Sequence, residues 1–298
     1  MRKFLALDLG GTFLKAAIID EETNILDKWK ISSKCECKED VLNIIYEAIE
    51  PHVKEVDAIA ISFPGVVDRD RAFCVTAGAF GDLFNELPLG DILKEKFGLP
   101  VAIDNDAKCA INAEIWNGAL KDCTNGLVYV IGTGLGGGIE INHQVYRGSN
   151  FSSGEISGPM MVYGESYSNN YQICKPLATP GLLNAYKKNA GIEDEIDGET
   201  FFDEVNNGNQ IAIDTLKKFC AMTATYFFNL QCVLDVDRIC VGGGISAQPI
   251  LLEMLQKELD QIYEDSWELK NKPELVKCHY ENDANLIGAV KNFIDLNG

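Results

Sequence analysis

The sequence predicts an α/β protein built from two similar halves, and three observations support this prediction. Apolar strand-like runs alternate with helical segments along the chain. A strand, a turn containing Gly and Thr, and a second strand occur at residues 4–20 and again at 127–141. A third glycine turn, Gly242–Gly244, follows another apolar run. Because the same unit occurs once in each half, we expect a duplicated architecture.

The composition is that of a globular protein. The 298 residues suffice for one large domain or two of ordinary size. No apolar run approaches the roughly 20 residues of a membrane span, and the early charge at Asp8 does not fit a signal peptide. The ten cysteines are scattered and form no CxxC motif, which favours free thiols in a reducing compartment. We therefore expect a cytoplasmic protein without a membrane partner.

The net charge of −19 limits the choice of ligands. It argues against binding to nucleic acid or to an anionic membrane surface. A small anionic substrate would then need local positive charge or a metal ion, for which Mg²⁺ is suited.

Elements in the first half follow from apolar periodicity. Strands are expected on both sides of the Gly10–Thr12 turn within 4–20, at 25–32, at 56–62 and at 101–103. Helices are expected at 40–52 with Asp40 as the N-cap, at 89–97, and from about 104 to 116. Residues 76–88 are interpreted as loop.

The second half begins with the strands of 127–141 and a hairpin turn at Asn142–His143. Residues 148–178 lack periodicity, and we expect them to form an ordered binding segment or lid. Further helices are expected at about 179–189, 199–206, 209–234, 249–263 and 284–296, and further strands at 238–241 and 275–278.

The turn from Gly132 to Gly138 contains five glycines in seven residues. Without Cβ atoms its backbone amides can approach a ligand closely, and successive amides can hold anionic oxygens. Gly132, Gly134 and Gly137 match the dinucleotide pattern G-x-G-x-x-G, but that pattern requires a following helix. Because a β-hairpin follows here, we predict a phosphate-binding turn of another kind.

Residues around the glycine turns suit phosphoryl transfer, which depends on positioning, charge neutralisation and a base that orients the acceptor hydroxyl. Asp8 could hold hydrated Mg²⁺, a hard cation that prefers oxygen ligands. Thr12 and Thr133 offer hydroxyl and backbone N–H groups to phosphates, and Lys15 offers a positive charge.

Two aspartates are candidates for the base. Asp106 follows a buried strand and opens a helix, where backbone amides anchor an acidic side chain. Asp283, within Glu281–Asn285, also follows a strand and opens a helix. Local reasoning alone does not separate them.

Taken in order, the motifs resemble the ROK family of sugar kinases and repressors, in the actin-like ATPase superfamily. The resemblance rests on Asp8-x-Gly10-Gly11-Thr12-x-x-Lys15, Pro64-Gly65, Asn105-Asp106-Ala107, Gly132-Thr133-Gly134-x-Gly136-Gly137-Gly138, Gly154-Glu155 and Gly242-Gly243-Gly244. It implies two actin-like (ribonuclease H-like) α/β lobes with the active site in a cleft between them. We expect one lobe at 1–115 with the C-terminal helix 284–298, and the other at 116–283. Family resemblance also implies a homodimer.

The resemblance assigns roles to the motif residues. It selects Asp106 as the catalytic base and makes Asp283 a helix cap. Sugar hydroxyls would be bound by Gly65, Asn105, Asp106 and Glu155. ATP would be bound, with Mg²⁺ held through water by Asp8, by the following residues: Asp8, Gly10, Gly11, Thr12, Lys15, Gly132, Thr133, Gly134, Gly242, Gly243 and Gly244.

Departures from the family pattern refine the expected function. The chain opens on a strand instead of the helix-turn-helix of the repressor branch, so nucleic-acid binding is not expected. The segment after Glu155 lacks the histidine and cysteine-rich zinc motif of many members, so we expect no zinc site; here it resembles β-glucoside kinases. Lys108 stands where the family usually has asparagine.

We therefore predict an ATP- and Mg²⁺-dependent kinase that phosphorylates a hexose or β-glucoside, at the 6-OH. The alternatives are a sugar-sensing protein of the same fold that has lost catalysis, and an N-acetylmannosamine or fructose kinase.

Overall fold

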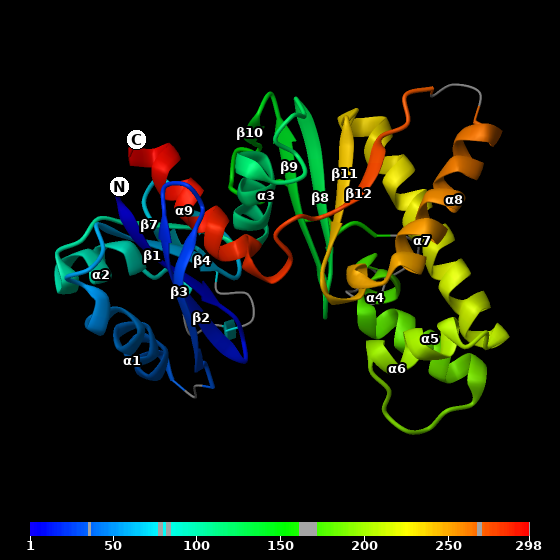
Figure 1. Cartoon of the computed structure of the whole chain (residues 1–298), viewed down its shortest axis with the longest axis horizontal. Helices are drawn as coiled ribbons and strands as arrows, with labels where there is room; N and C mark the ends of the chain where they lie inside the picture. Colours follow the sequence, from blue (N-terminus) through cyan, green and yellow to red (C-terminus); the bar gives the residue numbers. More distant parts are fainter. Residues whose placement is uncertain (35–36, 77–79, 82–84, 161–171, 267–269, 298) are drawn as a thin grey trace. The chain divides into compact units, whose positions relative to one another are not determined.

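The computed structural model describes residues 1–34, 37–76, 80–81, 85–160, 172–266 and 270–297. The chain divides into two compact units. Unit 1 comprises Met1–Lys121, Val145–Ser153 and Asn282–Gly298, and unit 2 comprises Asp122–Gln144 and Gly154–Glu281. Each unit contains one five-stranded mixed sheet, which confirms the predicted α/β class (Figure 1). Among the described residues, none of the helices has the length and apolarity to cross a membrane.

The sheet of unit 1 has the strand order β3-β2-β1-β4-β7. Strands β1 to β3 are antiparallel, whereas β4 and β7 continue the sheet parallel to β1. The strands are β1 (Lys3–Leu9), β2 (Phe13–Asp20), β3 (Ile25–Ser32), β4 (Ala58–Phe63) and β7 (Val101–Asn105). The carboxyl ends of β1, β4 and β7 therefore lie at one edge of the sheet, where α/β proteins commonly place ligand-binding residues.

Helices cover both faces of this sheet. One face packs Leu7, Ile61 and Ile103 against α1 (Lys38–Ile49) and α2 (Leu89–Phe97). On the other face α9 (Ala284–Asn297) contacts β1, β4 and β7, and α3 (Asp106–Asn117) packs on α9. A Cβ added to Gly288 of α9 would lie 1.7 Å from the carbonyl oxygen of Cys109 in α3, so only glycine permits this helix contact.

The predicted N-cap of α1 is wrong by three residues. The helix begins at Lys38 after Cys37, and Asp40 is its third residue. The carboxylate of Asp40 accepts the backbone N–H of Cys37 at 3.2 Å, which is the reciprocal contact of a capping box. An acidic residue at that position produces nearly the same local sequence signal as an N-cap, because both satisfy amides at the helix start.

The sheet of unit 2 repeats the arrangement, in the order β10-β9-β8-β11-β12. Its strands are β8 (Asn125–Ile131), β9 (Leu135–Ile141), β10 (Gln144–Val145), β11 (Arg238–Gly242) and β12 (Glu274–Lys277). Strands β8 and β9 are antiparallel, and β11 and β12 run parallel to β8. The turn after β9 has positive φ at Asn142 and His143, as a tight hairpin requires, which confirms the predicted hairpin.

One face of this second sheet carries the core of unit 2. Leu127, Tyr129 and Ile239 pack with apolar residues of the helices that follow in sequence. Figure 1 shows α7 and α8 along this sheet. The helices are α4 (Cys174–Leu177), α5 (Thr179–Ala190), α6 (Gly198–Asn206), α7 (Gln210–Leu234) and α8 (Pro249–Asp265).

The sequence-based element assignments differ from the structure mainly at short pieces. The short strands β5 (Val67–Asp68) and β6 (Phe73–Cys74) form a hairpin that the sequence did not indicate. Strand β7 extends to Asn105 because it pairs in parallel with Phe63 of β4. Residues 161–171 of the proposed binding segment or lid lie outside the described residues.

Candidate active site

In unit 1, polar residues on four neighbouring strands form a row across the sheet. Asp8 of β1 is opposite Lys15 of β2 and beside Ser62 of β4, and Ser62 is beside Asp104 of β7. Neighbouring strands lie about 4.8 Å apart, so Asp8 and Asp104 are separated by about 10 Å across the sheet. The row includes two of the predicted phosphate- and metal-binding residues, Asp8 and Lys15.

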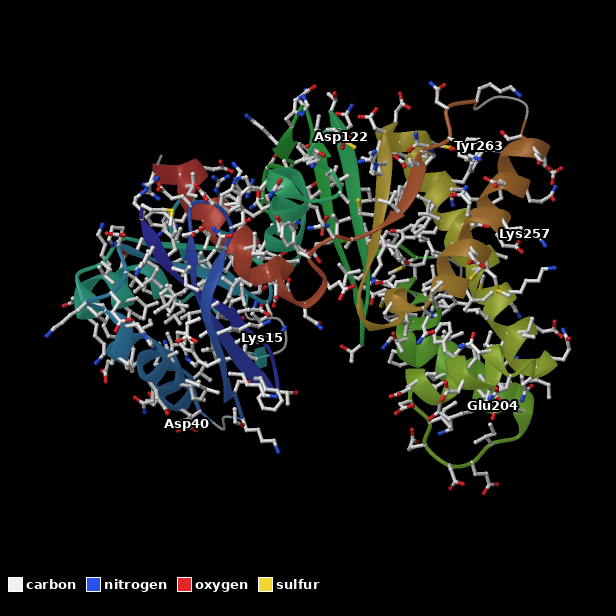
Figure 2. The ribbon with its side chains drawn as sticks, in the orientation of Figure 1. Lys15, Asp40, Asp122, Glu204, Lys257 and Tyr263 are labelled. Atoms are coloured by element: carbon white, nitrogen blue, oxygen red, sulfur yellow. The ribbon has the colours of Figure 1, made fainter. Side chains whose placement is uncertain are left out.

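The carboxylate of Asp8 is buried and fixed by three donors. Ser62 Oγ and Asn285 Nδ2 donate to its Oδ1 at 2.9 and 3.0 Å. Lys15 Nζ lies 3.1 Å from its Oδ2, and the Lys15 side chain is 37% exposed. Figure 2 labels Lys15. Lys15 is therefore an anchored cation beside a buried carboxylate, not a freely solvated strand residue.

The surroundings of Asp8 fit a hydrated Mg²⁺. Each carboxylate oxygen has two lone pairs, so Asp8 Oδ2, which accepts only Lys15 among the three donors, can accept one further hydrogen bond from metal-bound water. Mg²⁺ is commonly held by one or two carboxylates together with substrate phosphates. The described part of the chain contains no group of three or more His, Cys, Asp or Glu side chains placed to hold a metal by themselves.

The Gly10–Thr12 turn follows the end of β1, with Leu9 between it and Asp8. The Gly10 N–H donates to the carbonyl of Phe13 at 3.1 Å, which closes the turn between β1 and β2. Ser33 supports the turn from outside: its Oγ donates to the Gly10 carbonyl at 2.5 Å, and its N–H donates to the Thr12 carbonyl at 3.0 Å. Gly11 and Thr12 are exposed, so their backbone is accessible to a ligand.

The predicted sugar-binding residues of unit 1 are joined by the side chain of Asn105. Its Nδ2 donates to the Gly65 carbonyl at 2.8 Å and to Asp106 Oδ1 at 2.9 Å. Its Oδ1 accepts the Lys108 N–H at 3.1 Å, so Asn105 is also the N-cap of α3. Asp106 Oδ1 accepts the Ala107 N–H at 2.8 Å. The carboxylate of Asp106 is thus oriented by two donors.

The competing aspartate has different surroundings. Asp283 ends the short 3₁₀ turn Glu281–Asp283 and forms an ion pair with Lys28, with both side chains about a third exposed. The neighbouring residue Asn285 contacts Asp8 instead. Within Glu281–Asn285, therefore, it is the amide of Asn285 and not the carboxylate of Asp283 that contacts Asp8.

A buried ion pair supports the turn before Asp106. Asp104 is 2% exposed, and its Oδ2 accepts Arg147 Nη2 at 2.5 Å. A second guanidinium, that of Arg69, is close enough for Arg147 to contribute to its lowered pKa, although burial contributes more. Lys108, which stands where the family usually has asparagine, is 1% exposed in the first turn of α3.

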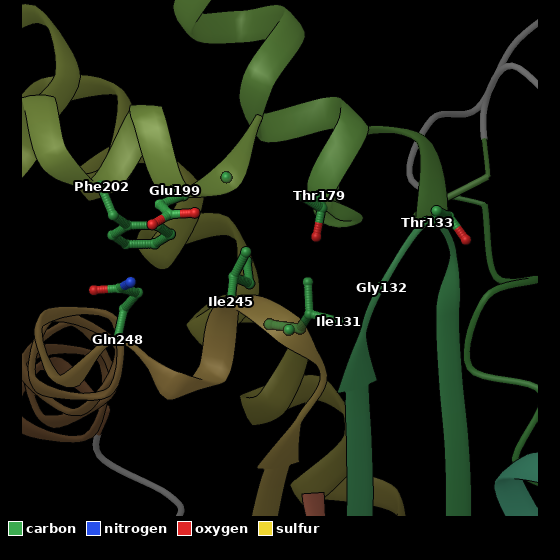
Figure 3. Close-up of a pocket in the computed structure, with 10 residues that line it drawn as sticks. Ile131, Gly132, Thr133, Thr179, Glu199, Phe202, Ile245 and Gln248 are labelled. Carbon is green, nitrogen blue, oxygen red and sulfur yellow. The ribbon is translucent and has the colours of Figure 1, made fainter. Parts of the chain in front are cut away.

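In unit 2 the second glycine turn borders a cavity of about 480 Å³. The Gly132 N–H donates to the Gly134 carbonyl at 2.9 Å, and the Gly132 carbonyl accepts the Thr179 N–H at 3.0 Å. Thr133 is exposed at the tip of the turn. The cavity, seen in Figure 3, is lined by Ile131, Gly132, Thr133, Thr179, Gly198, Glu199, Phe202, Gly244, Ile245 and Gln248.

The third glycine turn is held against the second. Gly243 has φ of +95°, and a Cβ there would lie 2.1 Å from the carbonyl oxygen of Ile131 at the end of β8. Ser246 Oγ donates to the Gly243 carbonyl at 2.7 Å. Gly244 lines the cavity. Thus the second and third predicted nucleotide turns come together around one cavity of unit 2.

The loop that carries Glu155 rests on strand β9. A Cβ added to Gly137 would lie 2.6 Å from Ile156 and 2.8 Å from the Gly154 carbonyl oxygen, so glycine is required for this approach. Tyr226 of α7 donates its hydroxyl proton to the Ile156 carbonyl at 2.8 Å. Glu155 itself is exposed.

Sequence reasoning missed several residues of these sites. Ser62 and Asn285 donate to Asp8, and Asp104 pairs with Arg147. The cavity residues Thr179, Glu199, Phe202 and Gln248 were also missed. Only Asn285 had a signal, because the string Glu281–Asn285 repeats the pattern around Asp106. The others come from strand registers and helix placements that no local motif encodes.

Comparison with known proteins identifies the family. The model of the ROK family matches residues 4–295. The chain therefore belongs to the ROK family, which confirms the resemblance inferred from the motifs.

Among individual relatives, a β-glucoside kinase of Klebsiella pneumoniae is 30% identical over 99% of this chain and 97% of its own length. A solved ROK family protein of Streptococcus pneumoniae in complex with sucrose has 27% identity and a TM-score of 0.88 over 98% of each chain. Other relatives, 25 to 27% identical, include a glucokinase of Halalkalibacterium halodurans and an N-acetylmannosamine kinase of Yersinia pseudotuberculosis.

The fold also occurs in a ROK family transcriptional regulator, at 21% identity and a TM-score of 0.84. A glucokinase of Streptomyces griseus, solved with glucose and AMPPNP, has a TM-score of 0.82 at 24% identity and shares the fold. The two-sheet α/β fold expected for this family is thereby confirmed.

Proposed function

We propose that the protein is an ATP- and Mg²⁺-dependent sugar kinase that phosphorylates a hexose or β-glucoside, at the 6-hydroxyl. One observation carries the proposal. The side chain of Asn105 fixes the Asp106 carboxylate at the carboxyl end of a parallel strand. This strand is two positions across the sheet from β1, whose buried Asp8 carboxylate pairs with Lys15. The candidate base Asp106 and the pair proposed to bind metal and phosphate, Asp8 and Lys15, thus lie at the same edge of the sheet of unit 1.

In the proposed reaction Asp106 acts as the base. Its carboxylate accepts the proton of the sugar hydroxyl while the hydroxyl oxygen forms a bond to the γ-phosphorus of ATP. The bond between that phosphorus and the β,γ-bridging oxygen breaks, and ADP leaves. Asp106 Oδ1 is already held by Ala107 and Asn105, so the carboxylate needs little reorientation before proton transfer.

ATP binding is assigned to residues of both units. Gly10, Gly11, Thr12 and Lys15 would bind phosphate oxygens in unit 1, and Gly132, Thr133 and Gly134 would do so in unit 2. The cavity beside Gly244 suits the nucleoside, because it combines the apolar Phe202 and Ile245 with the polar Glu199 and Gln248. Gly242 and Gly243 precede Gly244 in the same turn and are assigned to ATP binding together with it.

Asp8 would hold Mg²⁺ through water. When bound, the ion neutralises charge on the phosphates during transfer. Ser62, Asn285 and Lys15 keep the Asp8 carboxylate in one orientation toward that ion. The residues expected to bind the sugar are Gly65, Asn105, Asp106 and Glu155.

A β-glucoside or glucose is the substrate class that the relatives favour. The β-glucoside kinases are 30% identical over almost the whole chain. The segment after Glu155 also lacks the histidine found in many family members, which would leave more room beside the sugar. The lobe boundaries, the absence of zinc and a homodimer remain predictions of family resemblance.

The test is ADP release, measured with a coupled assay, over a panel of sugars. The panel is glucose, N-acetylmannosamine, fructose, cellobiose and aryl β-glucosides. We expect turnover with glucose or a β-glucoside that requires Mg²⁺. Sugar binding by calorimetry with no ADP release for any sugar would favour the alternative, a sugar-sensing protein without catalysis.

A further inference from the structure

The turn that presents Asn105 and Asp106 rests on the buried ion pair between Asp104 and Arg147. Asp104 Oδ2 accepts Arg147 Nη2 at 2.5 Å, and Asp104 Oδ1 accepts the backbone N–H of Asn105 at 3.0 Å. The Asp104 side chain is 2% exposed and that of Arg147 is 15% exposed. Both oxygens of Asp104 are therefore used, one by the arginine and one by the turn.

Three successive hydrogen bonds connect Arg147 with the carboxylate of Asp106. The first joins Arg147 to Asp104, the second joins Asp104 to the Asn105 backbone, and the third joins Asn105 Nδ2 to Asp106 Oδ1. A displacement of the Asp104 carboxylate would move the Asn105 backbone and, through its side chain, Asp106. Arg147, which is not among the proposed substrate-binding residues, is in this way connected to the proposed base, Asp106.

Arg147 is itself held at several points. Its Nη1 donates to the Val145 carbonyl at 3.1 Å, and its own carbonyl accepts the Ser153 N–H at 3.2 Å. Segment 145–153 belongs to unit 1 although residues of unit 2 precede and follow it. Arg147 is thus held by contacts within its own segment as well as by Asp104.

The ion pair is a costly way to obtain stability alone. Burial of two charges incurs a desolvation penalty that often cancels their attraction. The Nε of Arg147 is buried, and no hydrogen-bond partner for it occurs in the described ranges. Because well-packed apolar residues can often replace a buried ion pair without loss of stability, a role in geometry is a better reason for this pair than stability alone.

Arg69 is a second guanidinium close to the same carboxylate. Burial and the charge of Arg147 lower its pKa, and the charge of Asp104 acts in the opposite direction. Its Nε is likewise buried without a partner in the described part of the chain. When Arg147 is truncated, Arg69 is therefore a cation that could take its place beside Asp104.

We propose that Asp104 and Arg147 form a positioning pair that orients the Asn105–Asp106 turn for proton transfer from the sugar. This inference rests on the proposed kinase function. It predicts that Arg147 affects the chemical step and leaves ATP binding nearly unchanged, because a small misplacement of a reacting group costs up to about 100-fold in rate.

The test compares R147M, R147K, D104N and the double variant R69M/R147M with the wild-type protein. A matched control is R238M in unit 2, because Arg238 also pairs with carboxylates, those of Asp122 and Glu274, and its side chain is 19% exposed. We expect kcat to fall about 10- to 100-fold in R147M and further in the double variant, with KM for ATP within about twofold. R238M is expected to keep the wild-type kcat.

Chemical rescue separates positioning from general stability. In R147A, guanidinium ion at tens of millimolar should restore part of kcat, and it should restore nothing in D104N. Unchanged kcat in both R147M and R69M/R147M would overturn the proposal. So would a loss of kcat that tracks a loss of thermal stability shared by R238M and that guanidinium does not restore.

If the wild-type protein turns over no sugar, the proposed function is overturned. The positioning role can then still be tested by a structural measurement. Crystal structures of the wild type and R69M/R147M would then decide. Loss of the Asn105 contacts to Gly65 and Asp106 in the double variant supports positioning, and retention of both contacts overturns it.

Discussion

Asn285, in the first turn of α9, donates a hydrogen bond of 3.0 Å to the carboxylate of Asp8 at the end of β1, 277 residues earlier in the chain. Ser62 donates to the same oxygen. The orientation of Asp8 therefore depends on two distant parts of the sequence, and hydrogen bonds to charged groups contribute about 1.5–3 kcal/mol each.

Replacement of Asn285 should weaken the response to Mg²⁺. In N285A the Asp8 carboxylate loses one of the donors that orient it, so we expect half-saturation by Mg²⁺ to rise about 3- to 10-fold, as the loss of about 1 kcal/mol implies. Mg²⁺ titrations of ADP release measure this. N297A is the control, because Asn297 is on the same helix and donates to the Phe293 carbonyl. An equal rise in both variants would contradict the role given to Asn285.

The two candidate aspartates should behave differently on substitution. D106N should abolish turnover while ATP still binds, because the amide cannot accept the proton of the sugar hydroxyl. D283N loses an exposed ion pair with Lys28 and should cost at most about 1 kcal/mol of stability. Single-turnover assays and calorimetric ATP titrations distinguish the two. Activity in D106N together with inactivity in D283N would reverse the assignment.

Alanine substitutions in the nucleotide turns should differ in their effect on stability, because the added methyl groups contact different atoms. In G243A the added Cβ would lie 2.1 Å from a backbone oxygen at a φ of +95°, so we expect severe destabilisation. In G134A the added Cβ has nothing within 4 Å, so the protein should keep its melting temperature. Because the methyl group would project where phosphate is proposed to bind, KM for ATP should rise. A melting temperature lowered equally in both variants would count against this distinction.

The cavity of unit 2 should determine nucleotide affinity. In Q248A, the loss of one hydrogen bond to the base or ribose, about 0.5–1.5 kcal/mol, should raise KM for ATP up to about 10-fold with kcat unchanged. The control is Q261A, since Gln261 is exposed on α8 and bonds Asp265. KM values for ATP and for GTP in both variants test the assignment. Unchanged KM values in Q248A would contradict the assignment of the nucleoside to this cavity.

Glu140 of β9 should make stability depend on pH. Both of its carboxylate oxygens are buried, with no hydrogen-bond partner among the described residues, and burial raises its pKa from its ordinary value near 4.5 to about 8. Between these pH values the unfolded chain binds fewer protons than the folded protein. Stability must therefore fall as the pH rises from about 4.5 to 8, by up to about 1.4 kcal/mol per pH unit for this group.

The substitution E140Q should remove this dependence, because glutamine stays neutral at every pH. We expect E140Q to be more stable than the wild type at pH 8 and to differ little at pH 5. Urea unfolding at pH 5, 6, 7, 8 and 9 measures the effect, with E193Q as an exposed control. Parallel stability curves for the wild type and E140Q would show that Glu140 is not the group responsible.

The sequence predicted the fold because each sheet is built from strong local signals. Buried strands such as Ala58–Phe63 are continuous apolar runs, and the hairpin at Asn142–His143 has residues that tolerate positive φ. Short pieces such as Val67–Asp68 escaped prediction, since two residues carry no measurable periodicity. The helix start at Lys38 was misplaced because the acidic residue of a capping box resembles an N-cap.

The candidate site was predictable only where the residues lie within one motif. Asn105 and Asp106 are adjacent in sequence, and so their contact follows from a local turn. The contact of Arg147 with Asp104 depends on which unit receives the segment 145–153, and Ser62 reaches Asp8 through the strand register. Such long-range pairings leave no trace in local composition or spacing.

The division of unit 1 into three chain segments has a consequence for synthesis. Helix α9 covers the face of the sheet that carries Asp8, and its residues are translated after all of unit 2. During translation, therefore, one apolar face of the early strands of unit 1 has no cover from α9 until all of unit 2 has been made. Unit 2 is complete in sequence at Glu281, so it can fold first even though its residues are made later than β1.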